Sequence, residues 1–224
     1  MGKVLTVSTS ADALGDDPTG LWLEELAAPY LILKNKGYDV TIASVKGGKI
    51  PLDPTSMKPE NLTSHAQTFL ETSEDMKLLE NSVPIEGLKA DDYDAIFIPG
   101  GHGIAVDGPL DTTLRALISS FAASGKIVSA VCHGPVAFSG PEVNGKPIVA
   151  GKRVTCFSDS EEDAVGKSNL VPFKPETRLR ELGGLYEKGD DWTSHVVVDG
   201  KLITGQNPQS SEEIGKVLAE ALAA

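Results

Sequence analysis

The chain has 224 residues, of which 40% are hydrophobic and 23% are charged, and we expect one globular domain over residues 1–224. Its formal net charge of −12 repels phosphate backbones and anionic membranes, so neither nucleic acid nor a membrane is an expected partner. No apolar run is long enough to span a bilayer. Two cysteines make no disulfide framework, so the expected location is cytoplasmic, in the reducing cytosol or an organelle like it.

The first part of the chain predicts alternating strands and helices. Four elements are expected: a strand over 3–8, a helix over 20–36, a strand over 38–45 and a mostly helical stretch over 62–81. Thr19 is suited to cap the first helix and Gly37 to end it. The segment 38–45 (YDVTIASV) is β-branched and alternating, which is typical of a strand.

The second part continues this alternation. We expect strands over 94–98, 127–131 and 153–157, helices over 109–124, 175–182 and 210–223, and a hairpin of strands 195–198 and 202–205. Pro109 would begin its helix, where its missing N–H donor costs nothing. Strands that alternate with helices predict an α/β fold with a mainly parallel sheet sandwiched by helices, of the flavodoxin-like kind.

Three of the predicted strands end in sequences that carry chemistry. Ile98 leads into PGGHG, Val131 into CHGP and Phe157 into SDSEED. Ligands of open α/β sheets bind where the strands end at their carboxyl side. The Gly100-Gly101 backbone could direct N–H groups at a developing oxyanion, although a plain connecting loop would have the same composition.

Cys132 follows a strand that is expected to be buried on both faces. A cysteine on a sharp strand-to-helix turn resembles a nucleophile elbow, and a helix N-terminus would favour the reactive thiolate. His133 beside it is then a candidate proton carrier. A simply buried cysteine and a core histidine are the ordinary alternatives.

The acidic run after Phe157 contains Asp159, Glu161, Glu162 and Asp163. Such a run is usually a solvated loop, but one of its acids could orient the imidazole of His133 and complete a group of nucleophile, base and orienting acid. Spacing alone does not say which acid this is.

The segments IFIPGGHG, AVCHGP and LITGQNPQSS together resemble the ThiJ/PfpI superfamily. The resemblance covers nearly the whole chain and is closest to the branch of small heat-shock-type chaperones that includes glutathione-independent glyoxalase III. Class I glutamine amidotransferases share the sheet architecture but use a His-x-Glu pair. Here His195 is followed by Val196 and Val197, so ammonia transfer from glutamine is disfavoured.

The resemblance implies a role for each matching residue. Cys132 would be the nucleophile, His133 its partner, and Glu162 the acid of the triad, with Asp159 as the alternative. A glutamate on the first helix would contact the cysteine, and Glu25 matches that position better than Glu24. It also implies an oxyanion or substrate-binding region, made by Gly100, Gly101, His102 and the His133 backbone, with His102 and Trp192 bordering the pocket.

The implied activity is that of a cofactor-independent glyoxalase III-type lyase of the D-lactate dehydratase class. Methylglyoxal and similar dicarbonyls would become lactate and other 2-hydroxy acids through a Cys132 hemithioacetal, with deglycase activity by the same chemistry. The four histidines include no pair at ligand spacing, so no metal is expected. A homodimer is expected. The alternatives are a stress-response holdase chaperone or redox sensor, and a cysteine peptidase or amidase.

Overall fold

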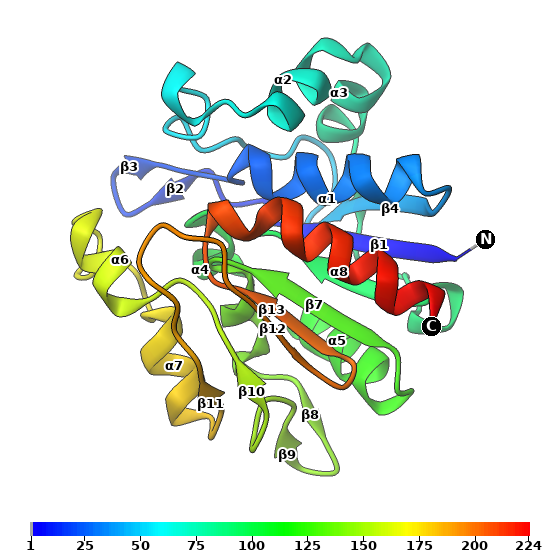
Figure 1. Cartoon of the computed structure of the whole chain (residues 1–224), viewed down its shortest axis with the longest axis vertical. Helices are drawn as coiled ribbons and strands as arrows, with labels where there is room; N and C mark the ends of the chain where they lie inside the picture. The colour runs from blue at the N-terminus through cyan, green and yellow to red at the C-terminus, as the bar shows by residue number, and fades with distance from the viewer. Residues whose placement is uncertain (1) are drawn as a thin grey trace.

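The computed structural model describes residues 2–224 and is built around a seven-stranded sheet (Figure 1). The strand order is β12-β13-β7-β6-β1-β4-β5. Neighbouring strands are parallel except that β12 is antiparallel to β13. The strand bounds are β1 Lys3–Ser8, β4 Asp39–Ser44, β5 Val83–Pro84, β6 Ala95–Ile98, β7 Ile127–Val131, β12 Val196–Asp199 and β13 Leu202–Gly205.

Helices cover both faces of this sheet. The α-helices are α1 Leu23–Asn35, α2 Ser64–Glu71, α3 Ser73–Glu80, α4 Gly103–Asp107, α5 Thr112–Ala123, α6 Asp159–Ala164, α7 Pro175–Glu181 and α8 Ser211–Ala223. Helices α1 and α8 lie side by side on one face, with α2 and α3 outside α1, and α5 lies behind the sheet (Figure 1). Among residues 2–224, no helix combines the length and apolar character that crossing a bilayer would require.

Short two-stranded sheets and 3-10 helices make up the remaining regular structure. The small sheets pair β2 Ala13–Leu14 with β3 Asp17–Pro18, β8 Glu142–Val143 with β9 Lys146–Pro147, and β10 Arg153–Val154 with β11 Leu185–Tyr186. The 3-10 helices are η1 Pro59–Asn61, η2 Ala90–Asp92, η3 Gly134–Ser139 and η4 Pro208–Ser210.

The central strands are apolar on both sides because both sides are buried. Val4 and Phe97 face the cluster that contains Ile214 of α8, whereas their neighbours on the same strands belong to the cluster packed under α5. Parallel sheets covered on both faces read as nearly continuous apolar runs in sequence for this reason. The predicted α/β fold with a mainly parallel sheet is confirmed.

The start of the first predicted helix was wrong by three residues. Helix α1 begins at Leu23, because Leu21 is held in an extended bridge to Leu52 and its amide donates to the carbonyl of Pro51 at 2.8 Å. Thr19 does not cap the helix. Its hydroxyl donates to Asp53 Oδ2 at 3.0 Å instead.

Two other helix predictions also needed correction. The stretch 62–81 forms two helices that meet at Thr72. Helix α5 begins at Thr112 rather than at Pro109, because the Asp111 carboxylate accepts a hydrogen bond from the Leu114 amide at 2.7 Å and caps the helix there.

The predicted strand 153–157 is mostly irregular. Only Arg153–Val154 pairs, and it pairs with β11 outside the main sheet. The acidic run that follows is not a solvated loop but helix α6. Ser158 and Glu161 form a capping box at its start, in which each side chain bonds to the backbone N–H of the other residue. This helix buries Glu161 and Glu162.

Candidate active site

Cys132 stands on the sharp turn that the sequence predicted at the end of β7. Its φ of 59° lies in the left-handed region that few residues other than glycine adopt. The backbone on both sides is fixed, because the Cys132 amide donates to the carbonyl of Gly205 at 3.0 Å and its carbonyl accepts from the Phe157 amide at 2.9 Å. The turn after Cys132 and His133 requires glycine at position 134, since a Cβ there would lie 2.2 Å from the Ile98 carbonyl oxygen.

A chain of three buried side chains begins at this cysteine. Cys132 Sγ lies 3.3 Å from His133 Nδ1, and His133 Nε2 lies 2.6 Å from Glu162 Oε2. Asp159, the alternative acid, instead accepts a hydrogen bond from the Thr177 hydroxyl at 2.6 Å. The structure therefore brings together Cys132, His133 and Glu162 as the resemblance implied.

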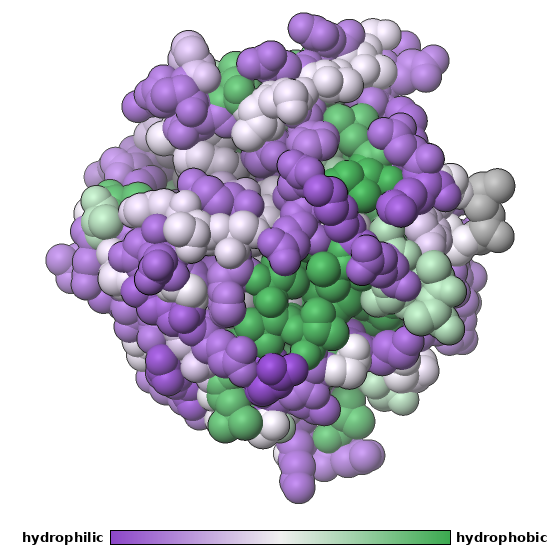
Figure 2. Space-filling view, in the orientation of Figure 1, coloured by the Kyte–Doolittle hydropathy of each residue, from purple (hydrophilic) through white to green (hydrophobic). Residues whose placement is uncertain are grey.

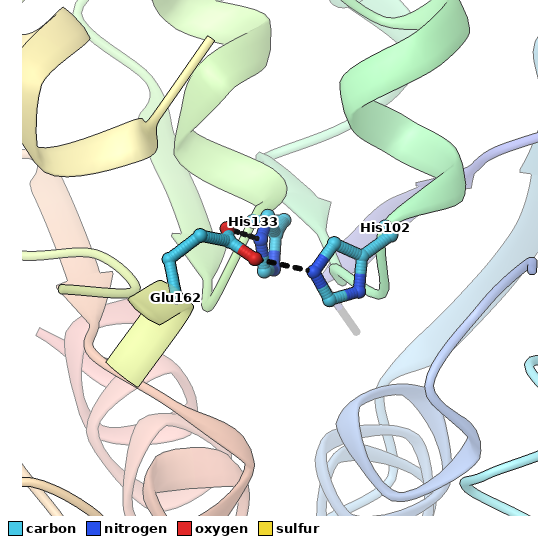
Figure 3. A group of neighbouring side chains, drawn as sticks. All are labelled: His102, His133 and Glu162. Atoms are coloured by element: carbon cyan, nitrogen blue, oxygen red, sulfur yellow. Dashed lines mark hydrogen bonds and ion pairs between the residues drawn. The ribbon is translucent and has the colours of Figure 1, made fainter. Parts of the chain in front are cut away.

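Glu162 also binds a second imidazole, which the sequence did not reveal. His102 Nε2 lies 2.7 Å from Glu162 Oε1 (Figure 3), and the rings of the two histidines lie 4.1 Å apart. Burial opposes ionisation of Glu162, but the two imidazoles outweigh it and hold the pKa of this carboxyl well below its usual range. Glu162 is therefore a carboxylate, which can only accept, so both Nε2 atoms carry hydrogen.

Glu25 reaches the site from the first turns of α1. It is 0% exposed, and its Oε2 accepts a hydrogen bond from the Gly100 amide at 2.6 Å. Burial raises its pKa to about 8, against smaller opposing effects of the Cys132 thiol and the Gly100 amide. Glu24 points elsewhere, to the Thr63 hydroxyl. The choice of Glu25 over Glu24 as the neighbour of the cysteine agrees with this placement.

The expectation of a thiolate stabilised by a helix N-terminus is wrong for the resting site. The segment after His133 is the short 3-10 helix η3, and burial together with the charge of Glu25 raises the pKa of Cys132 well above the usual value. Among the described residues, 2–224, Glu25 Oε1 has no hydrogen-bond partner although it is buried. Because two adjacent buried anions repel one another, a proton on Glu25 favours ionisation of Cys132.

A cavity of about 130 Å³ opens beside the cysteine. It is lined by Trp22, Asn61, Gly101, His102, Cys132, His133, Phe157, Val165, Trp192, Pro208 and Gln209. Gly101, His102 and Trp192 therefore lie where the resemblance placed them. The Gly100 amide is engaged by Glu25, so it does not face the cavity as a free donor.

Aromatic rings form one wall of this cavity. The Phe157 ring lies 4.6 Å from the His133 ring, and the Trp192 ring packs edge-on against Phe157 at 5.7 Å. A larger hollow of about 270 Å³ lies elsewhere, and it is lined by four lysines but by none of the predicted site residues. We place the site at the smaller cavity because the nucleophile is there.

Glu161 holds this wall in place, a role that sequence reasoning missed. Its Oε1 accepts from the Trp192 amide and from Asn207 Nδ2, both at 2.9 Å, and its Oε2 accepts from the Ser158 hydroxyl at 2.9 Å. Gln206 Nε2 donates to Oε2 as well, at 3.3 Å. The capping-box spacing of Ser158 and Glu161 was the one available signal.

His102, His133 and Glu162 also offer three possible metal-ligand atoms within 4.8 Å of one another. The expectation of no metal rested on sequence spacing, and the structure brings these two histidines together from the ends of two strands. Separations of 2.6 and 2.7 Å are hydrogen-bond distances, so we interpret the group as a hydrogen-bonded network.

Comparison with known proteins agrees with this fold. The chain belongs to the DJ-1/PfpI family, whose family model matches residues 20–221. Glyoxalase 3 of Candida albicans is 32% identical over 224 residues, which cover 94% of each chain. The crystal structure of glyoxalase III from the same organism has a TM-score of 0.90 at 30% identity and covers 98% of this chain and 97% of that one.

A solved structure of the Rapid Encystment Protein of Francisella tularensis is also similar. It has a TM-score of 0.94 at 36% sequence identity, and the match covers 99% of both chains.

Proposed function

We propose that the protein is a glutathione-independent glyoxalase that converts methylglyoxal and similar small dicarbonyls into 2-hydroxy acids. The observation that carries the proposal is the chain from Cys132 through His133 to Glu162 at the edge of a cavity of about 130 Å³. A water molecule takes about 30 Å³ of the liquid, so this cavity has room for a substrate of a few heavy atoms. The similarity to proteins named as glyoxalases, one of them of known structure, supports the same reaction.

In the proposed reaction, the Cys132 sulfur bonds to the aldehyde carbon and His133 passes the thiol proton to the new alkoxide, giving a hemithioacetal. His133, together with Glu25, then moves a proton from this carbon to its neighbour through an enediol, which leaves a thioester. Water releases the 2-hydroxy acid. The Cys132 thiol plays the part that glutathione would otherwise play, so no cofactor enters the scheme.

Two alternatives from other classes compare differently with the structure. A cavity of about 130 Å³ is too small for a peptide segment, which disfavours a peptidase. A holdase chaperone would need an exposed apolar surface, and Figure 2 shows apolar side chains gathered below α8, over β12 and β13. Chaperone function at that surface would not need Cys132. Deglycase activity would use the same cysteine chemistry as the glyoxalase reaction.

The test is to mix the purified protein with methylglyoxal, without glutathione or added metal, and to measure lactate. We expect lactate from the native protein and none above background from Cys132→Ala. Activity that survives Cys132→Ala, or that requires glutathione, would overturn the proposal. Suppression of client aggregation without any lactate would favour the chaperone. We also propose a homodimer, which light scattering tests independently.

A further inference from the structure

His102 differs from His133 in what its second ring nitrogen can do. The Nδ1 of His133 is occupied by Cys132 Sγ at 3.3 Å. Among the residues that the structure describes, His102 Nδ1 has no hydrogen-bond partner. It does not belong to the fully buried polar atoms without a partner, so it is at least partly accessible. Since His102 lines the cavity, this nitrogen is open to whatever occupies the cavity.

The bond to Glu162 decides the chemistry of that open nitrogen. The carboxylate must accept from His102 Nε2, so the ring proton is on Nε2. Burial, and secondarily His133, lower the pKa of His102 to about 4, so the ring is neutral at pH 7. In a neutral imidazole with hydrogen on Nε2, Nδ1 can only accept. His102 Nδ1 therefore cannot donate to a substrate oxyanion, but it can accept a proton from water or a hydroxyl group.

We propose that His102 is a second base of the site, and that it activates the water that hydrolyses the thioester on Cys132. This rests on the proposed glyoxalase function. The water oxygen bonds to the thioester carbonyl carbon while His102 Nδ1 takes one of its protons. The bond between that carbon and the sulfur then breaks, and the sulfur leaves with the bonding electron pair. His133 takes the proton that the product carboxyl releases as it ionises and passes it to the sulfur, and the proton on His102 passes to solvent through the cavity.

The position of His102 suits a base that acts after His133. The two rings share one carboxylate through its two oxygens and lie 4.1 Å apart. His133 can then stay with the sulfur throughout the reaction. The turn that presents His102 is rigid, because Gly101 has a φ of 87° and a Cβ there would lie 2.3 Å from the carbonyl oxygen of Gly20.

The test variant is His102→Gln, whose amide N–H can replace the bond to Glu162 but which cannot accept a proton at neutral pH. With methylglyoxal we expect a burst of about one equivalent consumed per site, followed by turnover about a hundredfold slower than that of the native protein. Acid quenching and mass spectrometry should find a lactoyl thioester on Cys132, because a hemithioacetal dissociates whereas a thioester survives acid. Hydroxylamine should restore turnover and yield the hydroxamate.

The matched control is His65→Gln, the same exchange at a histidine of α2 outside the cavity, which should keep native kinetics. Native turnover by His102→Gln would overturn the proposal, and so would slow turnover without an accumulated thioester, since His102 would then act before that stage. Should His102→Gln not fold, His102→Asn is measured in the same way. Failure of the proposed glyoxalase function is distinguishable, because the native protein would then make no lactate.

Discussion

Cys132 and Cys156 are both buried, with 3% and 0% of their surface exposed, and burial raises the pKa of each well above the usual thiol value. Their surroundings differ. Cys132 has an imidazole nitrogen 3.3 Å from its sulfur and an open cavity beside it. Cys156 packs in the core with Val154 and Leu179. Among residues 2–224, its sulfur has a single polar partner, the carbonyl oxygen of Phe157 at 3.6 Å.

The comparison shows that neither burial nor the pKa of the resting thiol distinguishes a nucleophile from a core residue here. The difference is a partner that can take the proton and a space that can admit a substrate. Both follow from the left-handed backbone at Cys132, which turns its side chain out of the strand direction at the sheet edge.

The largest expected contrast between the two cysteines is in alkylation. Limiting iodoacetamide should label Cys132 far ahead of Cys156, because Cys132 lines the site cavity and Cys156 does not. Labelling should also speed up as the pH rises, since the pKa of the Cys132 thiol is raised and the thiolate is the reactive form. Peptide mass spectrometry after timed quenching measures both. Equal labelling of the two residues in the folded protein would contradict the comparison.

The next contrast concerns the acids that follow Phe157. Glu162→Gln has one oxygen that can accept from an imidazole N–H, and it places its own amide N–H against the other imidazole N–H. His133 then loses its orientation, and kcat/KM for methylglyoxal should fall about a hundredfold. Asp159→Asn is the matched control. It should keep activity within about threefold, because Asp159 bonds to Thr177 and not to either histidine. The reverse result would show that Asp159 is the orienting acid.

Several parts of this site were predictable because they are local in sequence. Cys132 and His133 are adjacent, and the apolar run before them predicts the strand that carries them. The fold class follows from the alternation of strands and helices. The resemblance supplied Glu162 and Glu25, which spacing alone left open.

What the sequence could not show depends on distances between remote segments. His102 and Glu162 are 60 positions apart, and Glu161 bonds to Asn207, 46 positions away. No periodicity reports such contacts. The raised pKa of Cys132 was missed for a related reason, since it depends on burial and on the nearness of Glu25. The start of helix α5 was mispredicted for a local reason. Capping by the Asp111 side chain outweighs the preference for Pro109 as the first residue of the helix.

A smaller effect is expected from Glu25→Gln, which keeps an N–H donor near the sulfur but cannot transfer a proton. Activity should fall about tenfold to a hundredfold. In the native protein kcat/KM should decline above about pH 8, where Glu25 loses the proton that it would contribute to the transfer between the two carbons. In the variant this decline should be absent. A pH profile of kcat/KM for both proteins is the measurement, and an unchanged alkaline decline would assign it to another group.

The same substitution should change how stability depends on pH. The pKa of Glu25 is about 8 in the folded protein against an ordinary 4.5, so between these values the folded state binds a proton that the unfolded state has released. The contribution of Glu25 to the free energy of unfolding therefore decreases as the pH rises through this window. Urea denaturation at several pH values should show a shallower decrease in Glu25→Gln than in the native protein.

The smallest effect on activity is expected at the second cysteine. Cys156→Ala removes one sulfur atom from a closed part of the core, so the free energy of unfolding should fall by about 1 kcal/mol, as is common for single core truncations. Its kcat/KM should stay within about twofold of the native value, because Cys156 has no imidazole partner and lines no part of the cavity. Urea denaturation and the lactate assay measure the two quantities on the same sample. A loss of activity comparable to that of Cys132→Ala, with the fold intact, would mean that Cys156 takes part in the reaction and that a closed core position does not protect a thiol from a catalytic role.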